Sequence, residues 1–335
     1  MVCSTCAPET RALLTSGGVT RVEELLGRGG SRAVGGKLVN WMRFHRAAWR
    51  LLASIDRSEL LWIPTADTAM ALGRSLMRRR YVLSLRELYD KLPHYRLALK
   101  EFALRAASVV VPEYCRAHIF RSWYSLPVTP LVLPNKPHYH PRKRHLDLPA
   151  AAAGSLGAAS HARLVLYQGH LGANRDLRQV AAAVASLGLP WRLAVMGRPN
   201  TDTLTSLSGL CPDLIVLPFI PAPDYLAVTS HAYIGVVNYS HRSLNEVFCA
   251  PNKLWEYAGF GVPTLCGDLP GLALSVAARG AGVCCDMGDH RSVRDALEEI
   301  DANWGAASQE ATALYDSVDC RTIMSRIVER ALEPQ

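Results

Sequence analysis

The acid Glu256 lies in residues 251–263, which read Pro-Asn-Lys-Leu-Trp-Glu-Tyr-Ala-Gly-Phe-Gly-Val-Pro and predict a short helix between two turns. The unpaired N–H groups and the positive dipole end at a helix N-terminus attract an anion. A carboxylate one turn into the same helix can accept hydrogen bonds from hydroxyl groups beside that anion. A phosphate next to vicinal hydroxyl groups is typical of a nucleotide or a nucleotide sugar, so the segment predicts a site for one of them.

Alternating strands and helices surround this segment and predict a parallel sheet that positions it. Apolar runs in the second half of the chain predict six strands, at residues 163–168, 191–196, 214–217, 233–237, 264–266 and 281–285. Turning or polar residues follow several of these strands, at Gly169, Gly197, residues 218–221 and residues 238–252. Ligands of open α/β sheets bind outside the carboxyl ends of the strands, so we expect these residues to converge on one nucleotide site. Neither a GxGxxG motif nor a P-loop lysine pattern is present, which argues against a standard dinucleotide site and against an NTPase.

The first half of the chain has a similar pattern and predicts a second parallel sheet. Its strands are expected at residues 59–64, 81–85, 108–111 and 128–133, and its helices at residues 37–55, 65–80 and 95–107. The small residues between positions 141 and 160 predict a linker. We therefore expect an N-terminal domain at residues 1–140, a linker at 141–160, a C-terminal domain at 161–318 and a last helix at 319–335.

Residues 251–263 resemble a segment in the donor domain of family 4 glycosyltransferases, which reads Pro-Asn-Lys-Leu-aromatic-Glu-Tyr and ends in Ala-x-Gly-x-Pro. These enzymes have the GT-B fold, an α/β fold in which two Rossmann-like parallel-sheet domains face a cleft. The resemblance covers most of residues 60–270 in the order of the elements, and the donor half is its specific part. It implies transfer of a sugar, of the hexosyl type, from a nucleoside-diphosphate sugar to a glycan, a glycolipid or another acceptor. It also implies retention of the anomeric configuration, no metal or other cofactor, an acceptor site in the N-terminal domain, and a last helix that can cross back to that domain.

The resemblance assigns the donor site residue by residue. Glu256 would bind the ribose hydroxyl groups, and the backbone amides of Asn252, Lys253 and Leu254 would hold the distal phosphate. Arg175 and His170, in the loop after the first strand of the donor domain, would reach the diphosphate. Arg175 and Lys253 would then stabilise the negative charge on the departing nucleoside diphosphate. Other residues that would border the nucleotide are Gly169, Gly197, Phe219 and Ile220.

The chain departs from the family pattern in its donor half. The family often has two acids with seven residues between them, but the position eight residues before Glu256 is Phe248. The first acid is therefore absent, and Asn245 or Glu246 is expected to contact the sugar in its place.

The N-terminal half departs from the pattern as well. Many members have a histidine before the glutamate of the acceptor-domain loop, where this chain has Arg86 before Glu87. An arginine cannot act as a base at ordinary pH, although it could bind an acidic acceptor. Arg86 and Glu87 are the catalytic candidates of this half, Tyr89 is an acceptor candidate, and Asn135 is a candidate at the hinge. The usual first strand and glycine-rich loop are not recognisable in residues 1–35.

The positive charge of the chain is concentrated in its first half. Residues 1–145 contain 24 Lys and Arg against 10 Asp and Glu, a balance of +14, whereas the remainder has 13 against 19, a balance of −6. A basic half predicts an anionic partner, either an acidic or lipid-linked acceptor or an anionic membrane surface. The helix expected at residues 37–55 has Arg43, Arg46 and Arg50 on one face and is the candidate for peripheral membrane contact.

Length and composition limit the remaining possibilities. A chain of 335 residues with 49% apolar residues suits two folded α/β domains. No uninterrupted apolar stretch is long enough to span a membrane, and residues 1–35 lack the apolar core of a signal peptide. We therefore expect a cytoplasmic protein, either free or peripheral on the inner face of the membrane. The nine cysteines are expected to be reduced, and Cys3 and Cys6 form a lone CxxC with no second pair at zinc spacing, so no metal site is expected.

Two other functions stay open at this level. One is a catalytically degenerate GT-B protein that binds a sugar nucleotide without turnover, which Arg86 and the short N-terminal domain favour. The other, less favoured, is a nucleic-acid-binding protein that uses the basic half. No nucleic acid is expected as a partner, because the sequence has no nucleic-acid motif and no aromatic stacking platform.

Overall fold

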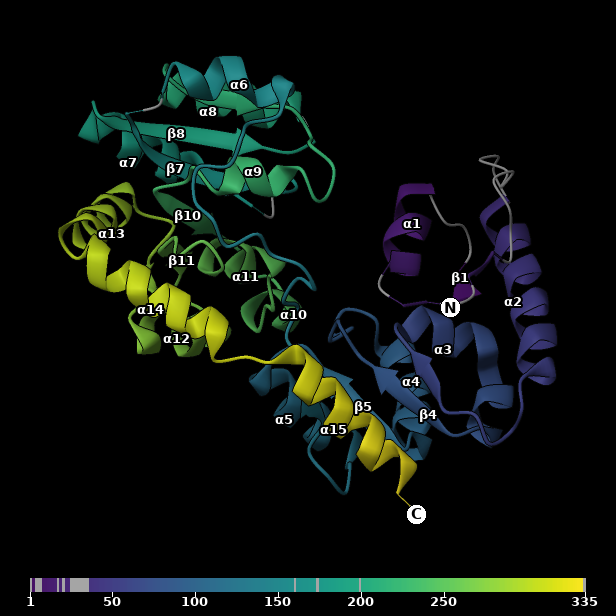
Figure 1. The fold of residues 1–335 in the computed structure, drawn as a ribbon. Helices are drawn as coiled ribbons and strands as arrows, with labels where there is room; N and C mark the ends of the chain where they lie inside the picture. Colours follow the sequence, from purple (N-terminus) through teal and green to yellow (C-terminus); the bar gives the residue numbers. More distant parts are fainter. Residues whose placement is uncertain are drawn as a thin grey trace.

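The structure is a computed structural model, and it describes residues 2–3, 8–16, 18–19, 22–24, 36–159, 161–172, 175–198 and 200–333. Two α/β domains make up most of the molecule (Figure 1), one built on a four-stranded sheet and the other on a six-stranded sheet. Every strand pair in both sheets is parallel. The predicted fold class, α/β with two Rossmann-like parallel sheets, is therefore confirmed.

The sheet of the N-terminal domain is formed by short strands, of which the two central ones, at residues 81–84 and 108–111, are fully buried. Its strands pair in the order β3 (Leu61–Ile63), β4 (Tyr81–Ser84), β5 (Ser108–Val111) and β6 (Leu131–Val132). The helices of this domain are α2 (Gly36–Ser54), α3 (Ala66–Leu72), the 3₁₀ helix η1 (Gly73–Arg78), α4 (Pro93–Arg105) and α5 (Tyr114–Tyr124). The α-helix expected to run to residue 80 ends at Leu72, because Gly73 has a φ of +57° and the chain continues as η1.

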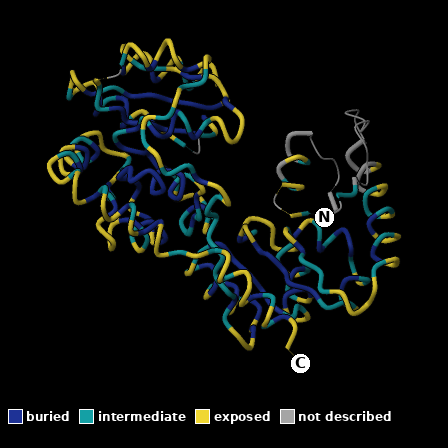
Figure 2. The backbone as a smooth tube through the Cα atoms, viewed as in Figure 1, coloured by how far each residue is buried: buried dark blue, intermediate teal, exposed yellow. Residues whose placement is uncertain are grey.

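The sheet of the C-terminal domain has the strand order of a doubly wound fold. From one edge to the other, its strands are β12 (Gly282–Cys285), β11 (Thr264–Gly267), β10 (Ile234–Val237), β7 (Arg163–Gln168), β8 (Trp191–Met196) and β9 (Ile215–Leu217). Successive residues of β7 alternate between two hydrophobic clusters, with Leu164 and Leu166 in one and Val165 and Tyr167 in the other. Both faces of the sheet are therefore buried, as Figure 2 shows for its strands. The order reverses between β7 and β10, and such a reversal is where open α/β sheets bind ligands.

Helices cover both faces of this sheet. In chain order they are α7 (Arg178–Leu187), α8 (Thr201–Leu210), α9 (Tyr225–Thr229), α10 (Leu244–Val247), α11 (Asn252–Ala258), α12 (Pro270–Ser275), η2 (Ala277–Arg279), α13 (His290–Ala302) and α14 (Trp304–Asp316). The segment predicted as a linker, residues 141–160, contains a further helix, α6 (Ala150–Gly157). Ala152 and Leu156 of α6 are buried in the core of the C-terminal domain, so this part of the segment is not a linker.

The last helix, α15 (Cys320–Leu332), lies on the N-terminal domain, whereas α14 before it packs on the C-terminal domain (Figure 1). Ile327 and Ala331 of α15 form a small hydrophobic cluster with Val82 of β4 and Val110 of β5. The Arg80 Nε also donates a hydrogen bond to the Ala331 carbonyl at 2.5 Å. The chain therefore crosses between the two domains twice within the described residues.

Within the described part of residues 1–35, the strands are β1 (Val2–Cys3) and β2 (Glu23–Glu24), and the helix is α1 (Pro8–Ser16). β1 and β2 pair with each other and do not join the four-stranded sheet. The side chains of Cys3 and Cys6 lie outside the described residues, as do residues 173–174 of the loop after β7. No helix in the described part of the chain is both long and apolar enough to cross a bilayer.

Candidate functional site

A cavity of about 680 Å³ lies between the two domains. The C-terminal domain lines most of it, with residues that follow β7, β8, β9 and β10 and with the first turns of α11. The N-terminal domain contributes Glu87, from the loop after β4, and Asn135, from the segment after β6. The cavity is therefore at the carboxyl edge of the C-terminal sheet, next to the point where its strand order reverses.

Glycines allow the ends of β7 and β8 to approach each other and the cavity closely. A Cβ atom on Gly197 would lie 1.9 Å from the Gly169 carbonyl oxygen, which is a backbone clash. Gly169 itself has a φ of +129°, and a Cβ atom there would lie 2.8 Å from the Lys253 Cε. Both positions therefore require glycine, and the space that they leave is taken up by the backbone and by the Lys253 side chain.

Helix α11 is anchored on the sheet by the residue after Glu256. The ring of Tyr257 packs where a Cβ atom on Gly235 of β10 would otherwise lie, and its hydroxyl donates to the Leu166 carbonyl of β7 at 2.8 Å. The same helix is held from its other side by His140, whose Nε2 bonds the Glu256 carbonyl at 3.0 Å. Lys253 and Glu256, one turn apart, both line the cavity as a result.

The Glu256 carboxylate is buried and hydrogen-bonded by two side chains. It is 8% exposed, and it accepts from the Tyr225 hydroxyl at 2.7 Å and from the Gln168 amide at 2.5 Å. Thr229 donates to the other atom of that amide at 2.7 Å, which fixes the orientation of Gln168. Burial raises the pKa of Glu256, and the two donors and Lys253 oppose this effect. The carboxylate is thus held in a defined position in the cavity wall, where it can accept hydrogen bonds from a ligand.

The Lys253 ammonium lies against two aromatic rings. Its Nζ is 4.4 Å from the centre of the Tyr167 ring, 5.8 Å from that of Tyr239, and 3.4 Å from the Tyr167 hydroxyl. Burial, followed by the nearby positive charge of Arg175, lowers the pKa of Lys253 to about 8. A cation with few polar partners in a cavity wall is well suited to bind an anion, because an anion would offset the cost of its desolvation.

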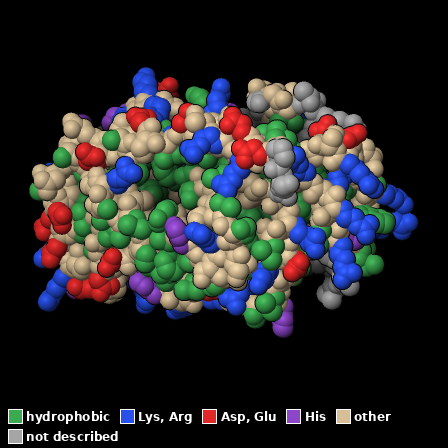
Figure 3. Space-filling view, turned by 90° about the horizontal axis from the view of Figure 1, so that it is seen from below, with side chains coloured by type: hydrophobic (Ala, Val, Ile, Leu, Met, Phe, Trp, Pro, Cys, Tyr) green, Lys and Arg blue, Asp and Glu red, His purple; other side chains and the backbone are tan. Residues whose placement is uncertain are grey.

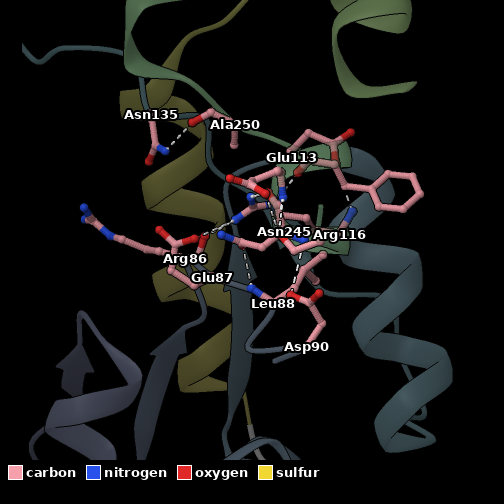
Figure 4. Close-up of polar contacts among 12 residues, drawn as sticks. Arg86, Glu87, Leu88, Asp90, Glu113, Arg116, Asn135, Asn245 and Ala250 are labelled. Carbon is pink, nitrogen blue, oxygen red and sulfur yellow. Dashed lines mark hydrogen bonds and ion pairs between the residues drawn. The ribbon is translucent and has the colours of Figure 1, made fainter. Parts of the chain in front are cut away.

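Most of the predicted site residues lie together in this cavity. The predicted site residues that line it are Glu87, Asn135, Gly169, His170, Gly197, Phe219, Ile220, Asn252, Lys253 and Glu256. Figure 4 shows Asn135 beside the segment that leads to α11, where its side-chain amide donates to the Ala250 carbonyl at 2.9 Å. The structure therefore brings together residues from positions 87 to 256, although their individual roles stay predictions.

The other predicted residues do not line the cavity. The guanidinium of Arg175 stacks on the ring of Tyr239 at 3.8 Å and lies 3.5 Å from Glu246, whose carboxylate also accepts from Ser240 and Ser243. The Leu254 side chain is buried in the core, which leaves only its backbone for a ligand.

The last three candidates, Asn245, Tyr89 and Arg86, do not line the cavity either. The side-chain oxygen of Asn245 accepts from the Leu88 N–H at 2.9 Å. The ring of Tyr89 packs on Tyr95, with ring centres 4.8 Å apart. The side chain of Arg86 points away from the contacts drawn in Figure 4, into a separate pocket that includes Trp62 and Lys136.

The sequence did not predict four residues of the cavity wall, namely Gln168, Met196, Arg198 and Tyr225. Gln168 could have been found, since a glutamine that ends an apolar strand and precedes Gly169 is out of place in a core. Tyr225 reaches the site because α9 contacts the end of β7, where Thr229 bonds Gln168, and no local pattern reveals this contact.

Metal ligands are not evident in the part of the chain that the structure describes, where no three His, Cys, Asp or Glu side chains gather as a metal site would require. The positively charged side chains of Arg198 and Lys253 line the cavity. The absence of a cofactor from the reaction stays a prediction.

Comparison with known proteins places the fold. No protein-family model matches the chain, and no curated protein is similar to it in sequence. Among solved structures, Anabaena HepE in complex with UDP and glucose superposes with a TM-score of 0.71 at 14% identity, over 98% of this chain and 90% of HepE. Sucrose-phosphate synthase from Thermosynechococcus elongatus gives a TM-score of 0.65 at 16% identity, over 93% of this chain and 81% of the synthase.

A third similar structure is an E. coli trehalose-6-phosphate protein bound with UDP-2-fluoro glucose, with a TM-score of 0.67 at 12% identity, over 91% of this chain and 80% of that protein. These structures have the GT-B fold, so the predicted fold is confirmed. Membership of family 4 stays a prediction.

Proposed function

We propose that this protein is a glycosyltransferase that transfers a sugar from a nucleoside-diphosphate sugar to an acceptor in the interdomain cavity. The observation that carries the proposal is that Lys253 and the buried Glu256 both line the cavity, at the carboxyl edge of a doubly wound sheet. Two GT-B structures with similar folds hold UDP or a UDP-sugar analogue. A uridine nucleotide is therefore the first donor to test.

Glu256 is proposed to bind the ribose hydroxyl groups, because its carboxylate is fixed and faces the cavity. Lys253 is proposed to bind the diphosphate and to stabilise it as the bond to the sugar breaks. Helix α11 has only seven residues, so the charge of Lys253 should contribute more than the helix dipole. This cation, with Arg175 close by, supports a reaction that needs no metal ion.

The acceptor is proposed to enter from the N-terminal domain, beside Glu87 and Asn135. Glu87 is a partly exposed carboxylate on the acceptor side of the cavity, which suits it to accept a proton from an acceptor hydroxyl group. The resemblance carried by residues 251–263 supports a hexosyl group as the sugar, a glycan or glycolipid as the acceptor, and retention of the anomeric configuration. An NMR spectrum of the anomeric proton in the product would test retention.

The N-terminal domain also supports an anionic acceptor or an anionic surface. Lys and Arg side chains gather over the N-terminal part of the face in Figure 3, and Arg43, Arg46 and Arg50 of α2 are exposed. Trp49 of the same helix is 56% exposed, although its indole N–H donates to Ser75. Sedimentation with vesicles tests this proposal: equal binding to neutral and phosphatidylserine-rich vesicles would remove the membrane surface as a partner.

A GT-B protein that binds a sugar nucleotide without transferring it is the second candidate. The departures from the family pattern favour it. Arg86 and Phe248 stand where many family members have a histidine and an acid, and neither residue lines the cavity. Incubation with UDP-glucose and other UDP-sugars separates the candidates. Release of UDP, slow with water and faster with an acceptor, supports the transferase. Thermal stabilisation by UDP with no release over hours supports the binding protein, and neither effect with any nucleotide would refute both.

A further inference from the structure

Arg116 of α5 is a buried cation that the proposed donor site does not use. It is 3% exposed, and the Glu113 side chain, which caps α5, accepts from its backbone N–H at 2.9 Å. Its guanidinium lies at the centre of the contacts in Figure 4 and donates to three backbone carbonyls, those of Arg86, Asn245 and Phe248. The hydrogen bond to the Asn245 carbonyl is 2.9 Å long, and the one to the Phe248 carbonyl is 2.6 Å long. Because Nε, Nη1 and Nη2 each bond a different carbonyl, the rigid fork of the guanidinium fixes the three groups relative to one another.

These carbonyls come from both domains. That of Arg86 belongs to the loop after β4, in which the cavity residue Glu87 follows, with its carboxylate 3.8 Å from Arg116. Those of Asn245 and Phe248 belong to the C-terminal domain, between β10 and α11. The Phe248 side chain packs against the hydrophobic core of the N-terminal domain. Phe248, at the position where the family pattern often has an acid, thus contacts the N-terminal domain in this chain.

Four more hydrogen bonds connect the N-terminal domain to the same segment, residues 244–250. Asp90 accepts from the backbone N–H groups of Leu244 and Asn245 at 2.8 and 3.3 Å. The Leu88 N–H and the Asn135 amide provide the contacts to Asn245 and Ala250 described above. The segment leads through one proline into α11, so the N-terminal domain holds the chain directly before Asn252 and Lys253.

We propose that Arg116 is a positioning residue for the transfer reaction, which holds the Glu87 loop and the start of α11 in one fixed arrangement across the cavity. This inference rests on the proposed function. The side chains that bond the Glu256 carboxylate and the Lys253 ammonium, those of Gln168, Tyr225 and Tyr167, lie in the C-terminal domain, so nucleotide binding should depend only weakly on Arg116. The alignment of Glu87 with the donor does depend on it. Loss of the guanidinium should therefore lower turnover much more than nucleotide affinity.

Kinetics of Arg116→Lys and Arg116→Ala test the proposal, with Arg144→Lys as the matched control. Arg144 is a partly buried arginine that donates to the Ala232 carbonyl at 2.8 Å within the C-terminal domain, away from the cavity. We expect kcat with UDP-glucose, or with the UDP-sugar turned over fastest, to fall at least about tenfold in both Arg116 variants, because small misplacements of reacting groups are costly. The Kd for UDP should stay within about threefold of wild type, guanidinium ion should restore part of the Arg116→Ala activity, and Arg144→Lys should resemble wild type.

An unchanged kcat would overturn the proposal, and so would a loss of UDP affinity as large as the loss of kcat, which would indicate a merely structural arginine. Hydrogen exchange provides a readout that needs no turnover. In Arg116→Lys, amides of residues 244–250 should exchange at least about tenfold faster, while those of β7 and β8 keep their rates. Unchanged exchange in residues 244–250 would overturn the proposal, whether or not the wild type transfers a sugar. Absence of sugar transfer by the wild type would, by itself, refute only the proposed function.

Discussion

Raising the pH from 7 to 9 should weaken the binding of UDP through one group, Lys253. Burial lowers the pKa of Lys253 to about 8, so the ammonium is about 90% protonated at pH 7 and about 10% protonated at pH 9. A bound diphosphate favours the charged form, so binding takes up a proton wherever the free lysine has lost it. The affinity is therefore highest below the pKa and falls as the pH rises through it. The expected loss between pH 7 and pH 9 is about tenfold in Kd.

Isothermal titration of wild type and Lys253→Arg at pH 7, 8 and 9 measures this effect. An arginine stays charged across this range, so its profile contains only the titration of the ligand and of other groups. The ratio of the two Kd values isolates the lysine, and it should change about tenfold over the two pH units. A ratio that stays constant within twofold would refute the reasoning, because Lys253 would then either be an ordinary exposed lysine or make no contact with the diphosphate.

Three further predictions concern Glu256 and Gly197 in the cavity wall and His140, which contacts helix α11. Glu256→Gln should weaken UDP binding about 10- to 100-fold, since a hydrogen bond to a charged group contributes about 1.5–3 kcal/mol, whereas UDP without its ribose hydroxyl groups should bind both proteins equally in titration calorimetry. Gly197→Ala should lower the free energy of unfolding by about 1–3 kcal/mol in urea and abolish UDP binding, because the new Cβ atom meets the Gly169 carbonyl oxygen at 1.9 Å. Gly209→Ala, a control in α8 with open space around it, should not be destabilising. His140 has a pKa lowered to about 4, mainly by burial, so it opposes folding increasingly as the pH falls from 6.5 towards 4. His140→Phe should flatten the pH dependence of the unfolding free energy there by about 1 kcal/mol per pH unit, and an unchanged slope would contradict the burial of a neutral histidine.

The sequence was sufficient for the central strands of both sheets. The strands at residues 108–111, 163–168 and 191–196 have the predicted bounds, because strands buried on both faces are continuous apolar runs with glycine, proline or polar residues around them. Helix α6 was mistaken for a linker, since its alanines and glycines resemble a flexible segment. It is a helix because Ala152 and Leu156, four positions apart, are buried in the core of the C-terminal domain.

The cavity residues of the C-terminal domain were predicted better than the residues of the N-terminal domain. Glu256, Lys253 and Gly169 follow from a local motif and from strand ends, both of which are visible in the sequence. Arg116 could not be found in this way, because its partners at positions 86, 245 and 248 are distant in the chain and bond through backbone carbonyls, which leave no pattern of side chains. Helix α5, which carries Arg116, was itself not predicted, although Phe120 and Tyr124 have helical spacing and are buried.

A crystal structure of the protein with UDP, or with the nucleoside diphosphate that stabilises it most, tests the central claim most directly. The account predicts the ribose hydroxyl groups within hydrogen-bond distance of the Glu256 carboxylate and the diphosphate beside the Lys253 ammonium, in the cavity between the domains. A nucleotide bound elsewhere, or one that enters this cavity without contacting either residue, would contradict it.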